Sequence, residues 1–377
     1  MKRVMNDRNM KIWAVEKAEL AAGAEEAVTA IGEAAVVLQN GGIVAFPTET
    51  VYGLGADARD TGAVERIFQA KGRPSDNPLI VHIAEMEQLE QIVLPYGEVA
   101  KRLMLRFWPG PLTIVLPARE GAVSPRVTAG LDTVAVRMPD HVTALRLIAV
   151  SGCPIAAPSA NRSGRPSPTR AAHVEEDLAG RIDGLVDSGP TGVGLESTVV
   201  EITEDGEAVR ILRPGGIALE ALREVVPVTP DSTVESVEQA AADKSGSPAG
   251  QEASAPRSPG MKYAHYAPQG AMQLVIGEPA AVRARIQDEV DAAQRRGEKT
   301  GVLTYTEHAP YYRADVVLAS GSLTRLESAA QGLYAALREF DTHGVQAIWA
   351  EACPQEGIGH ALMNRLSKAA GHRFIRV

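Results

Sequence analysis

Residues 42–55 read GIVAFPTETVYGLG, and two adjacent patterns in this stretch decide the fold. Ile43 to Phe46 is a short apolar run typical of a buried strand, and we expect Pro47 to end it. A segment rich in hydroxyls and glycines follows at once. Ligands of open α/β sheets bind at such strand ends, although a β-turn whose threonines cap local backbone groups accounts for the same residues.

Helical and strand patterns alternate on both sides of this stretch. Apolar residues from Val28 to Leu38 recur at helical spacing before it, and Thr61 is the predicted N-cap of a helix that stops near Gly72. Further strands are expected at 79–84, 112–116, 133–137, 155–157, 198–202 and 209–212, and further helices at 96–107, 141–150 and 169–178. This mixture predicts an α/β domain with a twisted sheet.

The composition changes after this domain. Residues 227–259 are rich in Ser, Pro, Ala and acidic residues and almost lack large apolar side chains, which predicts a linker. Beyond it, strands expected at 271–276, 301–305, 316–319 and 345–350 alternate with helices at 280–294, 326–340 and 361–370. This alternation predicts a smaller Rossmann-like α/β domain. We therefore expect domains at 1–226 and 271–377, joined by a linker at 227–270.

Bulk properties exclude several classes of protein. A chain of 377 residues is too long for one ordinary core, and its net charge of −9 disfavours duplex binding. Cys153 and Cys353 lie far apart, which excludes a disulfide framework or a Cys-based zinc site. We find no apolar run long enough for a signal peptide or a membrane span, so we expect a cytoplasmic protein without membrane contact.

A basic loop and an arginine mark two predicted strands. In KGRPSDNPLIVH (71–82), Lys71 and Arg73 follow a helix C-terminus, where cations offset the helix dipole. Together with two prolines and Asn77 they also form a rigid basic loop that suits phosphate. His82 is either a half-buried, satisfied histidine or a ligand contact. Arg137 ends its strand either as a solvated residue or as a fork for a carboxylate.

Polar segments lie beside three other predicted strands. APSANRSGRPSPT (157–169) has the composition of a flexible linker, but its proline density favours a fixed shape. GLESTVV (194–200) and ILRPG (211–215) add hydroxyls and Arg213 beside strands. The sequence contains no P-loop, dinucleotide fingerprint or H-E-x-x-H motif. If this protein uses ATP, it must therefore hold the phosphates with side chains, because it lacks a glycine-rich phosphate loop.

Seven blocks occur in order between Gly42 and Gly215: PTETVYGLG, KGRPSDNPLIVHI, WPGPLT, TVAVRMP, APSANRSGRPSPT, GLESTVV and ILRPG. They resemble the YrdC-like threonylcarbamoyl-AMP synthase family. MKYAHYAP (261–268) resembles the linker of its long form, which has an extra C-terminal domain. The resemblance implies a YrdC-like twisted-sheet domain that makes L-threonylcarbamoyladenylate and pyrophosphate from L-threonine, bicarbonate and ATP. The product serves threonylcarbamoyladenosine formation in tRNA.

The resemblance also assigns roles to individual residues. The residues implied to bind threonine are Thr48, His82, Arg137, Ala157 and Ser197. Those implied to bind ATP are Lys71, Asn77, Thr133, Ser159, Ser167, Arg213 and Tyr266, and those implied to be catalytic are Lys71, Arg73, Ser159 and Asn161. Mg²⁺ is expected with ATP, held by phosphates and water without side-chain ligands. If Tyr266 reaches ATP, residues 261–268 fold over the cleft as a lid.

The implied partners and the alternatives complete these expectations. We expect hand-over of the product to a tRNA threonylcarbamoyl transferase, with weak or indirect tRNA binding. An RNA-binding module that uses the basic cleft is the main alternative, which the acidic total and the lack of aromatic stacking residues disfavour. A carbamoyl-adenylate enzyme of hydrogenase maturation would need zinc-finger cysteines. A non-catalytic scaffold would leave the hydroxyl and arginine motifs unexplained.

Overall fold

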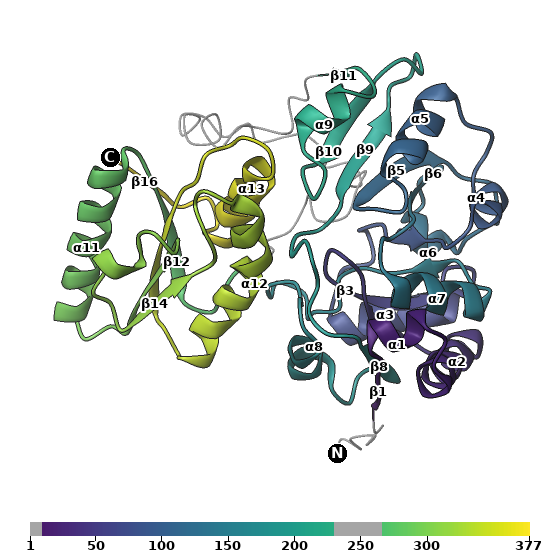
Figure 1. Cartoon of the computed structure of the whole chain (residues 1–377), viewed down its shortest axis with the longest axis horizontal. Helices are drawn as coiled ribbons and strands as arrows, with labels where there is room; N and C mark the ends of the chain where they lie inside the picture. Colours follow the sequence, from purple (N-terminus) through teal and green to yellow (C-terminus); the bar gives the residue numbers. More distant parts are fainter. Residues whose placement is uncertain (1–9, 230–265) are drawn as a thin grey trace.

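The computed structural model describes residues 10–229 and 266–377, which form two α/β domains (Figure 1). An 11-stranded mixed sheet forms the centre of the first domain, and a five-stranded sheet forms the centre of the second. The predicted fold class is therefore confirmed. The expected linker at 227–270 lies almost entirely outside the described residues. Within them, no helix is both long and apolar enough to cross a membrane.

The large sheet runs in the order β1-β8-β2-β3-β7-β4-β6-β5-β9-β10-β11. Its strands are β1 (Lys11–Ala14), β2 (Val44–Pro47), β3 (Tyr52–Asp57), β4 (Ile80–His82), β5 (Leu112–Pro117), β6 (Thr133–Arg137), β7 (Ile155–Ala156), β8 (Gly184–Asp187), β9 (Thr198–Ile202), β10 (Val209–Arg213) and β11 (Val228–Thr229). Strands β4 and β6 are parallel neighbours, and their last residues, His82 and Arg137, lie opposite each other. This register places two predicted site residues side by side.

The helices of the first domain pack their apolar faces against this sheet. They are α1 (Lys17–Ala21), α2 (Glu25–Gln39), α3 (Thr61–Lys71), α4 (Met86–Ile92), α5 (Glu98–Phe107), α6 (Pro125–Thr128), α7 (Val142–Ser151), α8 (Ala171–Leu178) and α9 (Leu219–Arg223). The N-cap of α3 is Asp60, and the prediction of Thr61 was wrong. The Asp60 carboxylate accepts hydrogen bonds from the amides of Gly62 and Ala63 at 2.8 and 3.1 Å.

Strand β2 ends at Pro47, as predicted, and Pro47 pairs with Tyr52 of the antiparallel strand β3. The glycine-rich segment that follows differs from its prediction, because β3 was not expected there. The turn is therefore confined to 48–51, and the glycine-rich segment is a buried strand. Strands β1, β8, β11 and β16 were not predicted either. These strands are short, and β3 is buried on both faces, so no alternation of polar and apolar residues marks it.

The second domain is a parallel sheet in the order β14-β13-β15-β12-β16. Its elements are β12 (Ala271–Ile276), α11 (Pro279–Arg295), β13 (Thr300–Thr304), the 3₁₀ turn η1 (Ala309–Tyr311), β14 (Val316–Ala319), α12 (Leu326–Thr342), β15 (Ala347–Glu351), α13 (Gly359–Ala369) and β16 (Phe374–Arg376). Helix α11 covers the outer face of the sheet, and α12 and α13 cover the face toward the first domain (Figure 1).

Candidate active site

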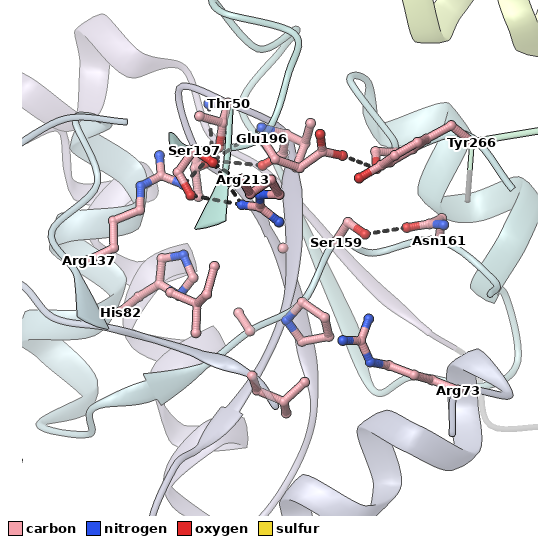
Figure 2. A pocket seen from close by; sticks show the side chains of 18 of the residues that line it. Thr50, Arg73, His82, Arg137, Ser159, Asn161, Glu196, Ser197, Arg213 and Tyr266 are labelled. Carbon is pink, nitrogen blue, oxygen red and sulfur yellow. Dashed lines mark hydrogen bonds between the residues drawn. The ribbon is translucent and has the colours of Figure 1, made fainter. Parts of the chain in front are cut away.

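An open cavity lies among the strand ends and loops of the first domain (Figure 2). Most of the predicted site residues line it: Thr48, Arg73, His82, Arg137, Ala157, Ser159, Asn161, Ser167, Ser197, Arg213 and Tyr266. Arg137 and His82 lie at one end of the cavity, and Arg73 and Asn161 lie at the other. The motifs that are dispersed in the sequence thus meet in one place.

Arg137 supplies a buried guanidinium at the first end, with a side chain that is 4% exposed. Its Nε donates to the Gly110 carbonyl at 3.2 Å, and its Nη1 donates to Thr50 Oγ1 at 2.9 Å. Its Nη2 lies 2.5 Å from Glu49 Oε2 in an ion pair but has no aligned hydrogen-bond acceptor among the described residues. A ligand carboxylate that binds this fork would therefore share Nη2 with Glu49 or displace it.

His82 and Thr48 complete this end. Burial, together with the neighbouring Arg137, lowers the pKa of His82 to about 3, so the imidazole is neutral at pH 7. Its Nδ1 has no hydrogen-bond partner within the described chain. Thr48 Oγ1 lies 2.7 Å from Thr50 Oγ1 and 2.7 Å from the Val51 carbonyl. The end thus combines a cation, a neutral imidazole and hydroxyls.

The opposite end is formed by the loop that carries Ser159 and Asn161, and Lys71 binds this loop without lining the cavity itself. The Lys71 ammonium donates to the carbonyls of Ser159 and Asn161, the latter at 2.5 Å. Ser159 Oγ in turn donates to Asn161 Oδ1 at 2.6 Å. Burial and the nearby Arg73 lower the pKa of Lys71 well below its ordinary value. Lys71 therefore fixes the position of the loop, whereas Arg73 lines the cavity and can contact a ligand directly.

A third group of side chains lies between Arg137 and the loop of Ser159 and Asn161, and together with that loop it forms the second end of the cavity. Arg213 Nη2 donates to the Ser197 carbonyl at 2.9 Å and to Ser197 Oγ at 3.1 Å, while Ser167 Oγ donates to Glu196 Oε1 at 2.6 Å. The glycine of ILRPG permits this arrangement. A Cβ on Gly215 would lie 2.3 Å from the Glu196 carbonyl, so only glycine lets the two strand ends pass each other.

Three predicted ATP-binding residues do not line the cavity: Lys71, Asn77 and Thr133. Thr133 begins β6, at the other end of the strand from Arg137. Asn77 is fully buried, and neither polar atom of its amide has a partner among the described residues. A bound ligand or water satisfies such a group in most proteins. The roles of these three residues in ATP binding stay predictions.

Sequence reasoning missed several groups at the cavity. Glu49 and Thr50 contact Arg137, and Glu196 is a carboxylate on the wall. The signal for Glu196 was present, because a lone acid precedes a buried strand inside GLESTVV. No signal marked Tyr334 and Arg365, which donate to Glu196 from the second domain. Of the expected lid, residues 261–265 lie outside the described residues, but Tyr266 lies in the cavity wall.

The donors around the cavity fit an anionic ligand. Residues 10–229 and 266–377 contain no group of three or more His, Cys, Asp and Glu side chains that could hold a metal ion. The oxygens of Glu196 already accept hydrogen bonds from Ser167, Tyr334 and Arg365.

Comparisons with known proteins agree with this geometry. The Sua5/YciO/YrdC family model, described as telomere recombination, matches residues 36–215, and the model described as "Threonylcarbamoyl-AMP synthase, C-terminal domain" matches residues 217–371. The chain is 53% identical to a threonylcarbamoyl-AMP synthase of Bacillus subtilis, covering 92% of this chain and 94% of the relative. The relative from Pyrococcus abyssi is 48% identical, over 91% and 95% of the two chains.

A solved structure gives the same result in three dimensions. The crystal structure of P. abyssi Sua5 complexed with L-threonine superimposes with a TM-score of 0.84 at 46% identity. The match covers 97% of this chain and 99% of that one. Both domains are therefore shared, not the first alone. The chain belongs to the Sua5/YrdC family of threonylcarbamoyl-AMP synthases.

Proposed function

We propose that this chain condenses L-threonine, bicarbonate and ATP to L-threonylcarbamoyladenylate, pyrophosphate and water. Family membership and the L-threonine complex of the P. abyssi relative support this reaction. The observation that carries it is the division of one cavity into two ends. A buried fork, whose Nη2 is ion-paired with Glu49 but donates no aligned hydrogen bond within the described residues, lies at one end, and hydroxyls and arginines lie toward the other.

The Arg137 end fits threonine. Nη2 of Arg137 would take the substrate carboxylate as a charge-assisted hydrogen bond in a buried site, where such bonds are strong. Thr48, Ser197 and the neutral His82 offer partners for the substrate hydroxyl. Because the pKa of His82 is about 3, the imidazole is neutral and can accept a hydrogen bond from the substrate without adding positive charge. The backbone of Ala157 forms part of the same wall.

The other residues fit the nucleotide. The amino nitrogen of threonine attacks the carbon of bicarbonate, and water is lost as the carbamate forms. A carbamate oxygen then bonds to the α-phosphorus of ATP, and the bond from that phosphorus to the bridging oxygen breaks as pyrophosphate leaves. Arg73, Arg213, Ser159, Asn161 and Ser167 would align the phosphates and offset developing charge.

The metal, the lid and the partner are parts of the same proposal. We expect Mg²⁺ to enter with ATP and to neutralise phosphate charge, held by phosphates and water. Tyr266, which belongs to the expected lid, lies in the cavity wall and would help to exclude water from the labile adenylate. The adenylate must then be consumed by a transferase that acts on tRNA, to which this chain hands it over, with weak or indirect tRNA binding of its own.

Pyrophosphate release by the purified chain tests the reaction. We expect release with ATP and Mg²⁺ only when both L-threonine and bicarbonate are present. Lys71→Ala should abolish release, because the loop of Ser159 and Asn161 loses its internal cation. Lys101→Ala, which removes an exposed lysine paired with Glu98, is the matched control and should retain activity.

Two results would contradict the proposal. Release that does not depend on threonine would point to a simple ATP pyrophosphatase. No release from a folded sample would favour the RNA-binding alternative, and a salt-dependent gel shift with RNA would then be the deciding measurement.

A further inference from the structure

Among the described residues that line the cavity, Glu196 is the one acidic residue, and it is 8% exposed. Ser167 Oγ donates to it at 2.6 Å from the first domain. The Tyr334 hydroxyl of α12 reaches both of its oxygens, at 3.0 and 2.8 Å, and Arg365 Nε of α13 donates at 2.8 Å. The second domain therefore supplies two of the three side chains that hold this carboxylate.

Arg365 connects several parts of the cavity wall. It is fully buried, and its Nη2 donates to the Pro214 carbonyl at 3.0 Å, next to Arg213. Its guanidinium lies 5.4 Å from the ring centre of Tyr266, which also stacks on Tyr334 at 5.3 Å with an interplanar angle of 23°. Tyr266 is thus positioned from two sides by residues of the second domain.

The backbone of the first domain is shaped for this contact. Gly194 lies two residues before Glu196 and has a φ of 80°, which favours glycine. A Cβ at this position would lie 2.3 Å from Gln331 Cα and 2.7 Å from the Ala330 carbonyl, both on α12. Any other residue would push α12 away. The GLESTVV motif therefore includes the contact with the second domain as well as site residues.

The charge of Glu196 creates a problem for a nucleotide site. Burial raises the pKa of this carboxyl, but Arg365, Arg213 and the Ser167 hydroxyl more than offset the rise and hold its pKa at about 2. Glu196 is therefore an anion at neutral pH. An anion without a partner on this wall would repel the phosphates of ATP across a low-dielectric cavity.

We propose that Arg365 and Tyr334 of the second domain are positioning residues for ATP binding, which act through Glu196. Arg365 cancels the Glu196 charge, and the pair holds Ser167 through Glu196 and Arg213 through the neighbouring Pro214 carbonyl. The second domain thus completes the nucleotide end of the cavity. This inference rests on the proposed function, because it assigns ATP to that end.

The full-length variant Arg365→Met tests the inference. We expect its KM for ATP to rise about tenfold or more, with the KM for threonine changed less than about threefold. The double variant Glu196→Gln/Arg365→Met removes both charges and should recover most of the loss. Equal rises in the two KM values, or a double variant no better than the single one, would overturn the inference.

A second, more conservative pair of variants keeps the inference testable if Arg365→Met does not fold. Tyr334→Phe and Tyr312→Phe each remove one buried hydroxyl that donates to a glutamate, Glu196 in the first case and Glu351 in the second. Tyr312 lies within the second domain, away from the cavity. We expect Tyr334→Phe to raise the KM for ATP about threefold and Tyr312→Phe to leave it unchanged. An equal change in the KM for ATP in both variants would overturn the positioning role of Tyr334.

Calorimetric binding of a non-hydrolysable ATP analogue separates this inference from the proposed function. Weaker analogue binding by Arg365→Met, restored in the double variant, would support the inference even if the wild-type chain released no pyrophosphate. Normal turnover by the wild-type chain with equal analogue binding by Arg365→Met would overturn the inference and leave the proposed function intact.

Discussion

The two ends of the cavity are built in different ways. At the threonine end, Thr48, His82 and Arg137 lie at or just after the ends of β2, β4 and β6, and the register of a single sheet sets their positions. At the nucleotide end, Ser167 and Glu196 lie in segments that Tyr334, Arg338 and Arg365 of the other domain hold. The first end depends on local strand pairing, and the second depends on how two domains pack.

Arg137→Ala should produce the largest effect, because it removes the fork of the locally built end and leaves Glu49 buried without its partner. We expect kcat/KM for threonine to fall about 1,000-fold in the pyrophosphate-release assay. Arg137→Lys keeps a positive charge near Glu49 but not the fork, so its loss should be intermediate. The matched control is Arg181→Ala, at an exposed position of the same domain. A loss below about tenfold would show that Arg137 does not bind the carboxylate.

Arg338→Ala should weaken the contact between the domains. Arg338 Nη2 donates to Asp177 at 2.8 Å and to the Pro166 carbonyl at 2.6 Å, and the Asp177 side chain has no exposed surface. Removing one partner leaves buried charge, so the free energy of unfolding should fall by about 3 kcal/mol. Urea unfolding measures this change. A fall below about 1 kcal/mol would show that Arg165, which also pairs with Asp177, is sufficient.

Acid should destabilise the first domain through its buried histidines. Burial lowers the pKa of His82 to about 3 and that of His141 to about 4. In the folded state both imidazoles therefore stay neutral, whereas in the unfolded chain they take up protons below about pH 6.5. The free energy of unfolding should therefore decrease as the pH falls from 6.5 toward 4. Between pH 7 and 5 each histidine should account for about 2 kcal/mol of the free energy of unfolding.

His141→Gln tests this pH dependence away from the cavity. Urea midpoints of the wild-type chain and the variant at pH 7 and pH 5 give the difference, and the variant should lose less stability on acidification. Equal losses of stability between pH 7 and pH 5 in the two proteins would show that His141 is already protonated in the folded state at pH 5.

Arg285→Ala should produce the smallest effect. Arg285 pairs with Glu289 one turn away on α11, the helix on the outer face of the second domain, and both side chains are partly exposed. Such pairs contribute little, so the free energy of unfolding should change by less than about 0.5 kcal/mol and the KM for ATP should not change. A larger effect on that KM would mean that the whole second domain, not its inner face alone, sets the nucleotide end.

Periodicity predicted much of the fold, because half-buried elements carry their pattern in the sequence. Strands β6, β9, β12 and β14 have the predicted bounds, and most helices differ by a few residues at their ends. Strand β3 was missed, since a strand buried on both faces and rich in glycine shows no alternation. The N-cap Asp60 was missed because two adjacent residues could cap α3, and only the backbone geometry selects one of them.

For the site, the sequence by itself determined which motifs are present and that seven polar blocks occur in order beside strands. It could do so because loops at strand ends are local and their residue types are specific to anion binding. Only the tertiary structure decided that Glu196 lies on the cavity wall, that Lys71 lies beneath the loop it supports, and that Arg365 reaches the site from 169 residues away. A contact between domains leaves no periodic pattern in either segment, because it depends on how two independently formed surfaces fit together.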